Sequence, residues 1–163
     1  MKYDHTEVRR QDRLLDEEDA RRLLAGGEYG VLSLVDRQDA YGIPVSYVWD
    51  GQERIYVHCA PEGKKLRCIR QNGRFSFCVV GRTNVLPGEF TTEYESVVAF
   101  GTASAEITND EKRKALELIV GKYSPQYREL GMKYLEKSFA RTRIIRLDIA
   151  SWAGKSKKIQ ESR

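Results

Sequence analysis

Hydrophobic and polar positions alternate along the chain with two different periods. A period near 3.6 residues predicts helices, and these cover residues 17–24, 64–70 and 109–123, with a further short helix after Ser124-Pro125. A period of two predicts strands, and these cover residues 29–34, 44–49, 54–59, 74–80, 96–107 and 141–149. The pattern therefore predicts six strands, with helices near the start, in the middle and towards the end.

Capping and turn residues set the limits of several elements. Asp16 is a good N-cap for the first helix, and either Thr108 or Asn109 caps the third. Asp50-Gly51 is a strong turn signal, so the strands on either side of it are expected to form a hairpin.

The remaining segments are read as turns and loops. Residues 35–42 are expected to form a turn, Gly101 a bulge or a bend, and residues 81–93 a long loop of the kind that often carries function. Six strands joined mostly by short turns favour a closed antiparallel barrel with peripheral helices, a mainly β (α+β) fold. The 163 residues suit a single domain, with residues 1–10 and 156–163 as flexible tails.

Composition narrows the function classes. Hydrophobic residues make up 40% and charged residues 32%, which is ordinary for a globular fold. No apolar run approaches the roughly 20 residues that a membrane span needs, and the polar start shows no secretory signal. We therefore expect a cytoplasmic protein with no membrane partner.

Charge and cysteine content exclude two further classes. The net charge is +4, but basic residues are mostly interleaved with acids and are not interleaved with aromatic residues, so nucleic-acid binding is not expected. A weak preference for anionic small molecules remains. Cys59, Cys68 and Cys78 form an odd set without a CxxC pair, and the two histidines complete no metal-ligand spacing, so neither a disulfide framework nor a metal site is predicted.

The segment with the most candidate binding and catalytic residues lies where a predicted strand ends and a predicted helix begins. His58-Cys59-Ala60 ends the strand, Pro61-Glu62-Gly63 breaks it, and the helix begins with Lys64 and Lys65. Helix starts favour anions, so lysines there oppose the helix dipole unless an anion lies between them. A bound phosphate or carboxylate would resolve the conflict; two exposed lysines at a small energetic cost are the alternative.

Several segments in this order resemble a known superfamily: the early strand YGVLSLV, then IPVSYVW, IYVHCAPEGKKL, RFSFCVVG and FTTEYESVVAFGTA. The order resembles the pyridoxamine-phosphate-oxidase-like FMN-binding split barrels, and within them most the 5-nitroimidazole resistance proteins. The resemblance runs from about Arg9 to Lys155. It implies a six-stranded antiparallel split β-barrel with peripheral helices, acting as a homodimer with FMN in a cleft between the subunits.

The resemblance also implies which residues contact FMN. Backbone groups along one strand would line the flavin, at Pro44, Val45, Ser46, Tyr47 and Val48. His58, Cys59 and Ala60 would lie beside the ring system and ribityl chain, and Lys64 and Lys65 would hold the phosphate. Ser96 would approach from the start of the long strand. Trp152 follows the last predicted strand and would come from the partner subunit, although simple packing suits it equally.

The chain departs from true pyridoxamine-phosphate oxidases at two places. Those enzymes carry an arginine where this chain has Ile43 and Pro44, and they end in an Arg-x-His motif where this chain ends in SWAGKSKKIQESR. Oxidation of vitamin B6 is therefore not expected, and phosphate binding would depend more on the two lysines.

His58 is the candidate catalytic residue. Its position matches the histidine of the resistance proteins, and it could donate a proton or hydrogen bond to a substrate that the flavin reduces. A nucleophilic pair with Cys59 is excluded, because successive strand residues point to opposite faces. For Tyr47 and the other strand aromatics, a place in the core is favoured over a flavin contact.

Three functions remain open. The first is an FMN-dependent oxidoreductase that reduces a small electrophile, for example a nitroaromatic such as a 5-nitroimidazole, although no GxGxxG fingerprint for a nicotinamide donor is present. The second is a non-catalytic flavin- or haem-binding or sensing module, with His58 as an axial ligand. The third is a scaffold that only dimerises, which the intact lysines Lys64 and Lys65 argue against.

Overall fold

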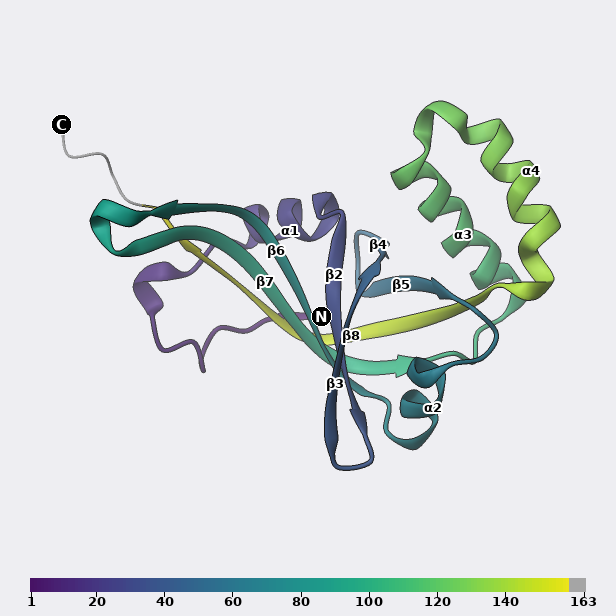
Figure 1. The fold of residues 1–163 in the computed structure, drawn as a ribbon, viewed down its shortest axis with the longest axis horizontal. Coiled ribbons are helices and arrows are strands. Elements are labelled where there is room, and N and C mark those ends of the chain that lie inside the picture. Colours follow the sequence, from purple (N-terminus) through teal and green to yellow (C-terminus); the bar gives the residue numbers. More distant parts are fainter. Residues whose placement is uncertain (159–163) are drawn as a thin grey trace.

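The computed structural model describes residues 1–158 and consists of one large sheet with helices around it (Figure 1). The strands are β1 (Lys2–Tyr3), β2 (Tyr29–Asp36), β3 (Asp39–Ser46), β4 (Val48–Trp49), β5 (Arg54–Cys59), β6 (Arg74–Leu86), β7 (Thr91–Ser104) and β8 (Arg143–Lys157). The helices are α1 (Glu17–Gly26), α2 (Lys64–Gln71), α3 (Asn109–Tyr123) and α4 (Arg128–Ser138). Short 3₁₀ turns lie at Gln11–Arg13, Pro87–Glu89, Pro125–Tyr127 and Phe139–Arg141.

The sheet curls into a barrel that its hydrogen bonds leave open. The strand order is β3-β2-β6-β7-β8-β5-β4, and β1 lies parallel to β8 off this path. β3 contacts β5, yet the two strands are not paired. The mainly β split-barrel class with peripheral helices is confirmed, but within residues 1–158 the sheet has eight strands rather than the predicted six, and the barrel is not closed.

Helix limits follow the capping residues. The Asp16 carboxylate accepts a hydrogen bond from the backbone N–H of Asp19 at 2.8 Å, as a good N-cap does. At the start of α3 the Thr108 hydroxyl accepts from Glu111 N at 3.2 Å, which settles the choice between Thr108 and Asn109. Asp50-Gly51 joins β4 to β5 in the predicted hairpin.

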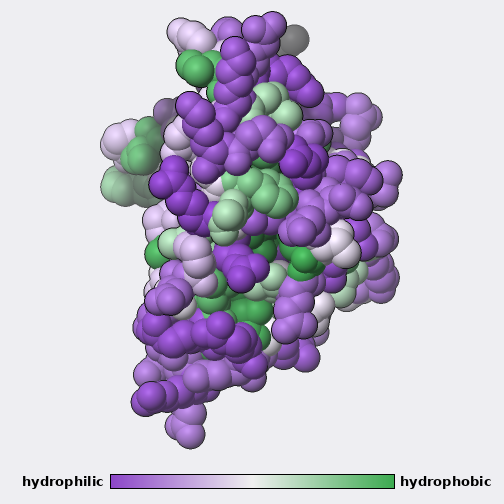
Figure 2. Space-filling view, turned by 90° about the vertical axis from the view of Figure 1, so that its right-hand side faces the viewer, coloured by the Kyte–Doolittle hydropathy of each residue, from purple (hydrophilic) through white to green (hydrophobic). Residues whose placement is uncertain are grey.

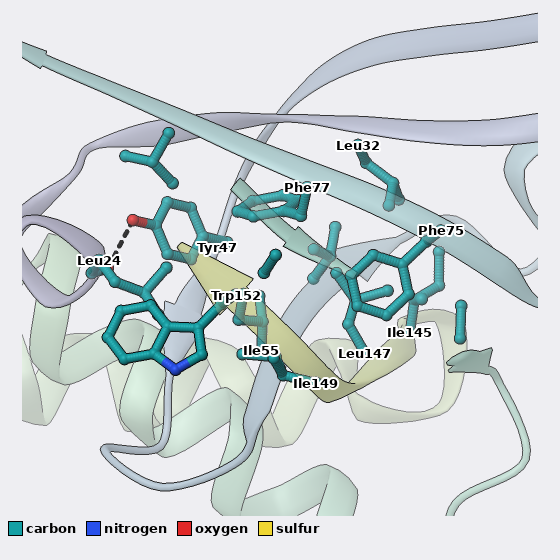
Figure 3. Close-up of a cluster of buried hydrophobic side chains, with 14 of the residues drawn as sticks. Leu24, Leu32, Tyr47, Ile55, Phe75, Phe77, Ile145, Leu147, Ile149 and Trp152 are labelled. Carbon is teal, nitrogen blue, oxygen red and sulfur yellow. Dashed lines mark hydrogen bonds between the residues drawn. The ribbon is translucent and has the colours of Figure 1, made fainter. Parts of the chain in front are cut away.

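The main core fills the concave side of the sheet (Figure 3). Tyr47 and Phe77 pack edge to face with ring centroids 4.9 Å apart, and the Tyr47 hydroxyl donates to Leu24 O at 2.6 Å. Because Tyr47 is fully buried, its hydroxyl needs a hydrogen-bond partner within the protein, and Leu24 O provides it. This hydrogen bond ties the C-terminal half of α1 to the segment between β3 and β4.

A smaller cluster lies on the other face of β5 and β8, beneath α3. It contains Val48, Tyr56, Ala115 and Ile144. Figure 2 shows the side of the molecule that carries α2 and the α3–α4 pair, where the surface is mostly hydrophilic and hydrophobic atoms form a narrow strip. Among residues 1–158, no helix combines the length and apolar character needed to span a membrane.

Two segments expected to be turns or loops are strands. Residues 81–93 belong to an arm in which β6 and β7 pair as far as Leu86 and Thr91, with a bulge between Val80 and Thr83. Figure 1 shows this arm projecting past α1, on the opposite side from α3 and α4. Residues 35–42 likewise belong to a hairpin, in which Val35 pairs with Ala40 and Asp36 with Asp39. Arg37, at φ 61°, lies in the tight turn between them. The predicted loop conformation of residues 81–93 is therefore wrong.

Both chain ends extend the sheet further than predicted. Lys2 and Tyr3 pair with Ser151 and Trp152, so the segment assigned to an N-terminal tail contributes a strand. β8 continues to Lys157, eight residues beyond the predicted end at Ile149. The last part of the expected C-terminal tail, residues 159–163, lies outside the described residues.

Candidate functional site

The split in the barrel places two incompletely paired strand edges near each other. β3 pairs only with β2, and the β4 partner of β5 covers only Ile55 and Tyr56. Pro44 is therefore paired on one side only, with β2, and His58 and Cys59 on one side only, with β8; their other sides have no strand partner among residues 1–158. A proline is tolerated on such an edge because it lacks an N–H. Unpaired edges offer backbone groups to a ligand.

The side chains of β3 alternate across this edge. Ile43 and Val45 pack against the main core, whereas Pro44 and Ser46 are exposed. After Ser46 the chain turns inwards: Tyr47 is 0% exposed in the main core. Val48 belongs to the smaller cluster. Tyr47 and Val48 could therefore meet a ligand only through backbone groups.

His58 and Cys59 point to opposite sides of β5, as predicted. Cys59 packs against the main core, and His58 lies opposite Ile144 with its side chain exposed. Burial raises the pKa of the Cys59 thiol, while the nearby charges of Lys65 and Arg143 act in the opposite direction. The expected absence of a Cys–His pair agrees with this geometry, and Ala60 follows as an exposed residue.

The start of α2 has neither a capping side chain nor an acidic residue in its first turn. Its N-cap is Gly63, at φ 147°, which makes no side-chain capping bond, and the first turn contains no acid. Lys65 lies within electrostatic reach of Cys59. Lys64 Nζ lies 2.9 Å from Asp36 Oδ2 and 4.5 Å from the centre of the Tyr41 ring. One of the two lysines is thus already compensated by an acid that sequence reasoning missed.

Lys122 and Tyr123 form a second polar group that the sequence did not reveal. The Tyr123 hydroxyl lies 2.8 Å from Tyr47 N and 2.6 Å from Glu28 O, so it accepts from the first and donates to the second. Lys122 Nζ donates to Gly27 O at 2.7 Å and lies 3.9 Å from the Tyr47 ring centre. Lys122 and Tyr123 line a hollow of about 660 Å³ that Ser46 also borders.

The stability of the protein is expected to depend on pH through Lys122. Burial lowers the pKa of this ammonium to about 8, from an ordinary value of 10.5. Between these two values the unfolded chain binds more protons than the folded one, so the stability contributed at this site rises with pH. The Tm of wild type relative to Lys122→Met should increase between pH 7.5 and pH 10. A Tm difference that stays constant would contradict this account.

Two predicted site residues lie apart from this region. Ser96 pairs with Val80 and Lys155 and points away from the core, towards the outer face of the sheet. It is the sixth residue of β7 rather than its start, because the strand begins at Thr91.

The prediction that Trp152 follows the last strand is wrong. Trp152 lies inside β8, opposite Ala99, and is 1% exposed in the core of its own chain. Tyr3 packs on its edge with ring centroids 4.8 Å apart. This burial agrees with simple packing, the alternative that the sequence left open, and a flavin contact of Trp152 from the partner subunit stays a prediction. The structure therefore brings together the edge of β3, the end of β5, Lys64 and Lys65.

Comparisons with known proteins agree with the fold. The chain is similar to a candidate 5-nitroimidazole antibiotic resistance protein of Bacteroides thetaiotaomicron (16% identity, 88% of this chain and 86% of that chain covered, TM-score 0.74). It is also similar to the FAD and heme binding protein of Mycobacterium smegmatis (20%, 91% and 74%, TM-score 0.75). A third similar structure is the flavocytochrome Anf3 of Azotobacter vinelandii (17%, 88% and 68%, TM-score 0.71). At these identities the likeness shows the fold.

Comparison of the sequence with known families identifies the family to which the chain belongs, which the similar structures do not. No curated protein matches the chain. The family model described as pyridoxamine 5'-phosphate oxidase matches residues 16–156, which include both strand edges and the start of α2. The chain therefore belongs to the pyridoxamine 5'-phosphate oxidase family of split barrels.

Proposed function

We propose that this chain is a cytoplasmic FMN-dependent oxidoreductase that reduces a small electrophile, for example a nitroaromatic such as a 5-nitroimidazole. The observation that carries the proposal is the pair Lys64 and Lys65 at an uncapped helix start, beside the unpaired edges of β3 and β5. The similar fold of the candidate 5-nitroimidazole resistance protein supports the substrate class.

The residues present fit a flavin mononucleotide. Lys65, Lys64 and the free N–H groups of the first turn of α2 would hold the phosphate. Backbone groups from Pro44 to Val48 would hydrogen-bond the polar edge of the ring system, apart from the Tyr47 N–H, which already donates to the Tyr123 hydroxyl. His58, Cys59 and Ala60 would border the ring and ribityl chain. FMN would supply electron transfer, while the protein orients it and shields it from water.

His58 is the proposed proton donor. Its imidazole is exposed at the mouth of the split and makes no hydrogen bond among the described residues, so it is free to meet a substrate. In this role the imidazole of His58 would donate a proton to the substrate while FMN supplies two electrons. A reduced nicotinamide is the proposed source of those electrons.

Turnover tests this role. With FMN, NADPH or NADH and a 5-nitroimidazole, wild type should consume the nitro compound, and His58→Gln should turn over about tenfold more slowly. This loss is smaller than the ~100-fold expected of an enclosed general acid, because the side chain is exposed. His5→Gln is the control, with no expected effect. Turnover is compared at saturating FMN, so that a change of FMN affinity in His58→Gln does not enter the rates, and His5→Gln should bind FMN as wild type does. Wild type that binds FMN without turnover would contradict the enzymatic role.

The outer face of the sheet supports a homodimer. Phe100 is 49% exposed and Val80 is 53% exposed, and Ser96, Val98 and Phe100 line a hollow of about 620 Å³. Apolar surface of this kind is commonly covered by a partner. In the proposed dimer a second copy covers this face, the flavin lies between the copies, and each chain brings its Ser96 to the interface.

Haem binding without turnover is the second candidate. The similar structures include an FAD and heme binding protein and a flavocytochrome, and the exposed imidazole of His58 is free to act as an axial ligand. A Soret band after addition of haem that is lost in His58→Gln would favour this function over the first.

A further inference from the structure

One of the two lysines proposed to hold phosphate already has an anionic partner. Lys64 Nζ lies 2.9 Å from Asp36 Oδ2, and the two side chains are 44% and 31% exposed. The ammonium also lies over the Tyr41 ring. The hydrogen bond from Lys64 is the largest of the effects that lower the pKa of Asp36. The carboxylate is therefore ionised at neutral pH.

The pair joins two elements that are distant in sequence. Asp36 is the last residue of β2, and Lys64 is the first residue of α2. Asp39 is the register partner of Asp36 across the tight turn, yet it makes no ion pair within the described part of the chain. Lys65 likewise has no ion pair there. The arrangement therefore singles out one acid and one lysine.

We propose that Asp36 limits the affinity of this site for the phosphate of FMN by competing for Lys64. The inference rests on the proposed flavin function. A phosphate that approaches Lys64 must share the ammonium with the carboxylate or displace it, and the two anions repel each other. Lys65 then remains as the main uncompensated cation. Asp36 is thus a specificity-determining residue, because it reduces the preference for FMN over a flavin without phosphate.

The test compares FMN with riboflavin, which has no phosphate. Binding is measured by the change in flavin fluorescence at low salt for wild type, Asp36→Asn and Asp39→Asn. Asp36→Asn should bind FMN about fivefold more tightly, the size that one exposed ion pair carries, with unchanged riboflavin affinity. Asp39→Asn removes the same charge from the residue directly opposite Asp36 across the turn, which makes no ion pair in the described part of the chain, and it should change both affinities less than twofold. High salt should reduce the Asp36→Asn effect.

Each other outcome has a distinct meaning. FMN binding that Asp36→Asn leaves unchanged or weakens overturns the inference, since Asp36 would then be neutral or would position Lys64 for the phosphate. An equal gain in Asp39→Asn also overturns it, because a general charge effect would explain the result. These outcomes leave the proposed function intact. Failure of wild type and both folded variants to bind either flavin would instead contradict the proposed function, and the inference with it.

Discussion

Lys64→Ala/Lys65→Ala is expected to bind FMN at least about a hundredfold more weakly than wild type. Hydrogen bonds to a charged group contribute about 1.5–3 kcal/mol each. Lys64 already shares its ammonium with Asp36, so most of the effect should come from Lys65. Equilibrium binding followed by flavin fluorescence measures the loss. The structural reason is the first turn of α2, which contains no acid and receives no side-chain cap.

Two controls separate phosphate recognition from other effects. Riboflavin should bind the double variant nearly as well as wild type, because only the phosphate loses its partners. Lys133→Ala/Lys137→Ala removes two exposed lysines from α4 and the same total charge, and it should leave FMN affinity within about twofold. Equal losses for FMN and riboflavin would show that α2 is not the phosphate site.

Gly101→Ala is expected to destabilise the fold by about 3 kcal/mol, at the upper end of the cost of overpacking a tightly packed site. A Cβ at Gly101 would lie 1.9 Å from Asp148 O and 3.0 Å from Ala150 N, both backbone atoms. The β7–β8 register shifts between Phe100 and Gly101, so the glycine lets the two strands approach closely at a bulge. The sheet would have to separate to admit the methyl group.

Thermal unfolding measures this prediction, with an expected fall in Tm of about 10 °C. Gly88→Ala is the matched control, because a Cβ there meets nothing within 4 Å and its φ is not in the left-handed region; its Tm should stay the same or rise slightly. β8 also pairs with β5 at His58 and Cys59, so flavin binding should weaken with the fold. A Gly101→Ala protein with an unchanged Tm would refute this account of the bulge.

Local signals predicted much of the fold. Asp16 as a cap, the Asp50-Gly51 hairpin and the bulge at Gly101 depend on neighbours in sequence, and all three are confirmed. The strand-to-helix transition that ends in Lys64 and Lys65 was also placed correctly, because Gly63 interrupts two clear periodicities.

Other features depend on pairing that the sequence does not display. Pro87 and Gly88 made residues 81–93 look like a loop, although only the 3₁₀ turn Pro87–Glu89 and Phe90 separate the two strands. Beyond Ile149, small residues weaken the alternation, so the second half of β8 was missed, and with it the place of Trp152 inside the strand.

Long-range polar contacts in the site were invisible for a related reason. The pair between Asp36 and Lys64 joins two segments whose charges look ordinary in the sequence. The Tyr123 hydroxyl reaches backbone groups of Tyr47 and Glu28 only because α3 packs beside the end of β3. No periodicity or motif in the sequence predicts such contacts, because they form only between segments that the folded barrel brings together.

Sedimentation velocity of the protein with FMN, followed at the visible absorbance of oxidised flavin, tests the central claim most directly. The account predicts that flavin absorbance sediments with the protein, at about one flavin per chain and at twice the chain mass of 18.8 kDa. Flavin absorbance that stays with free FMN at micromolar protein would contradict the flavin site, and flavin that sediments at the mass of a single chain would contradict the shared cleft.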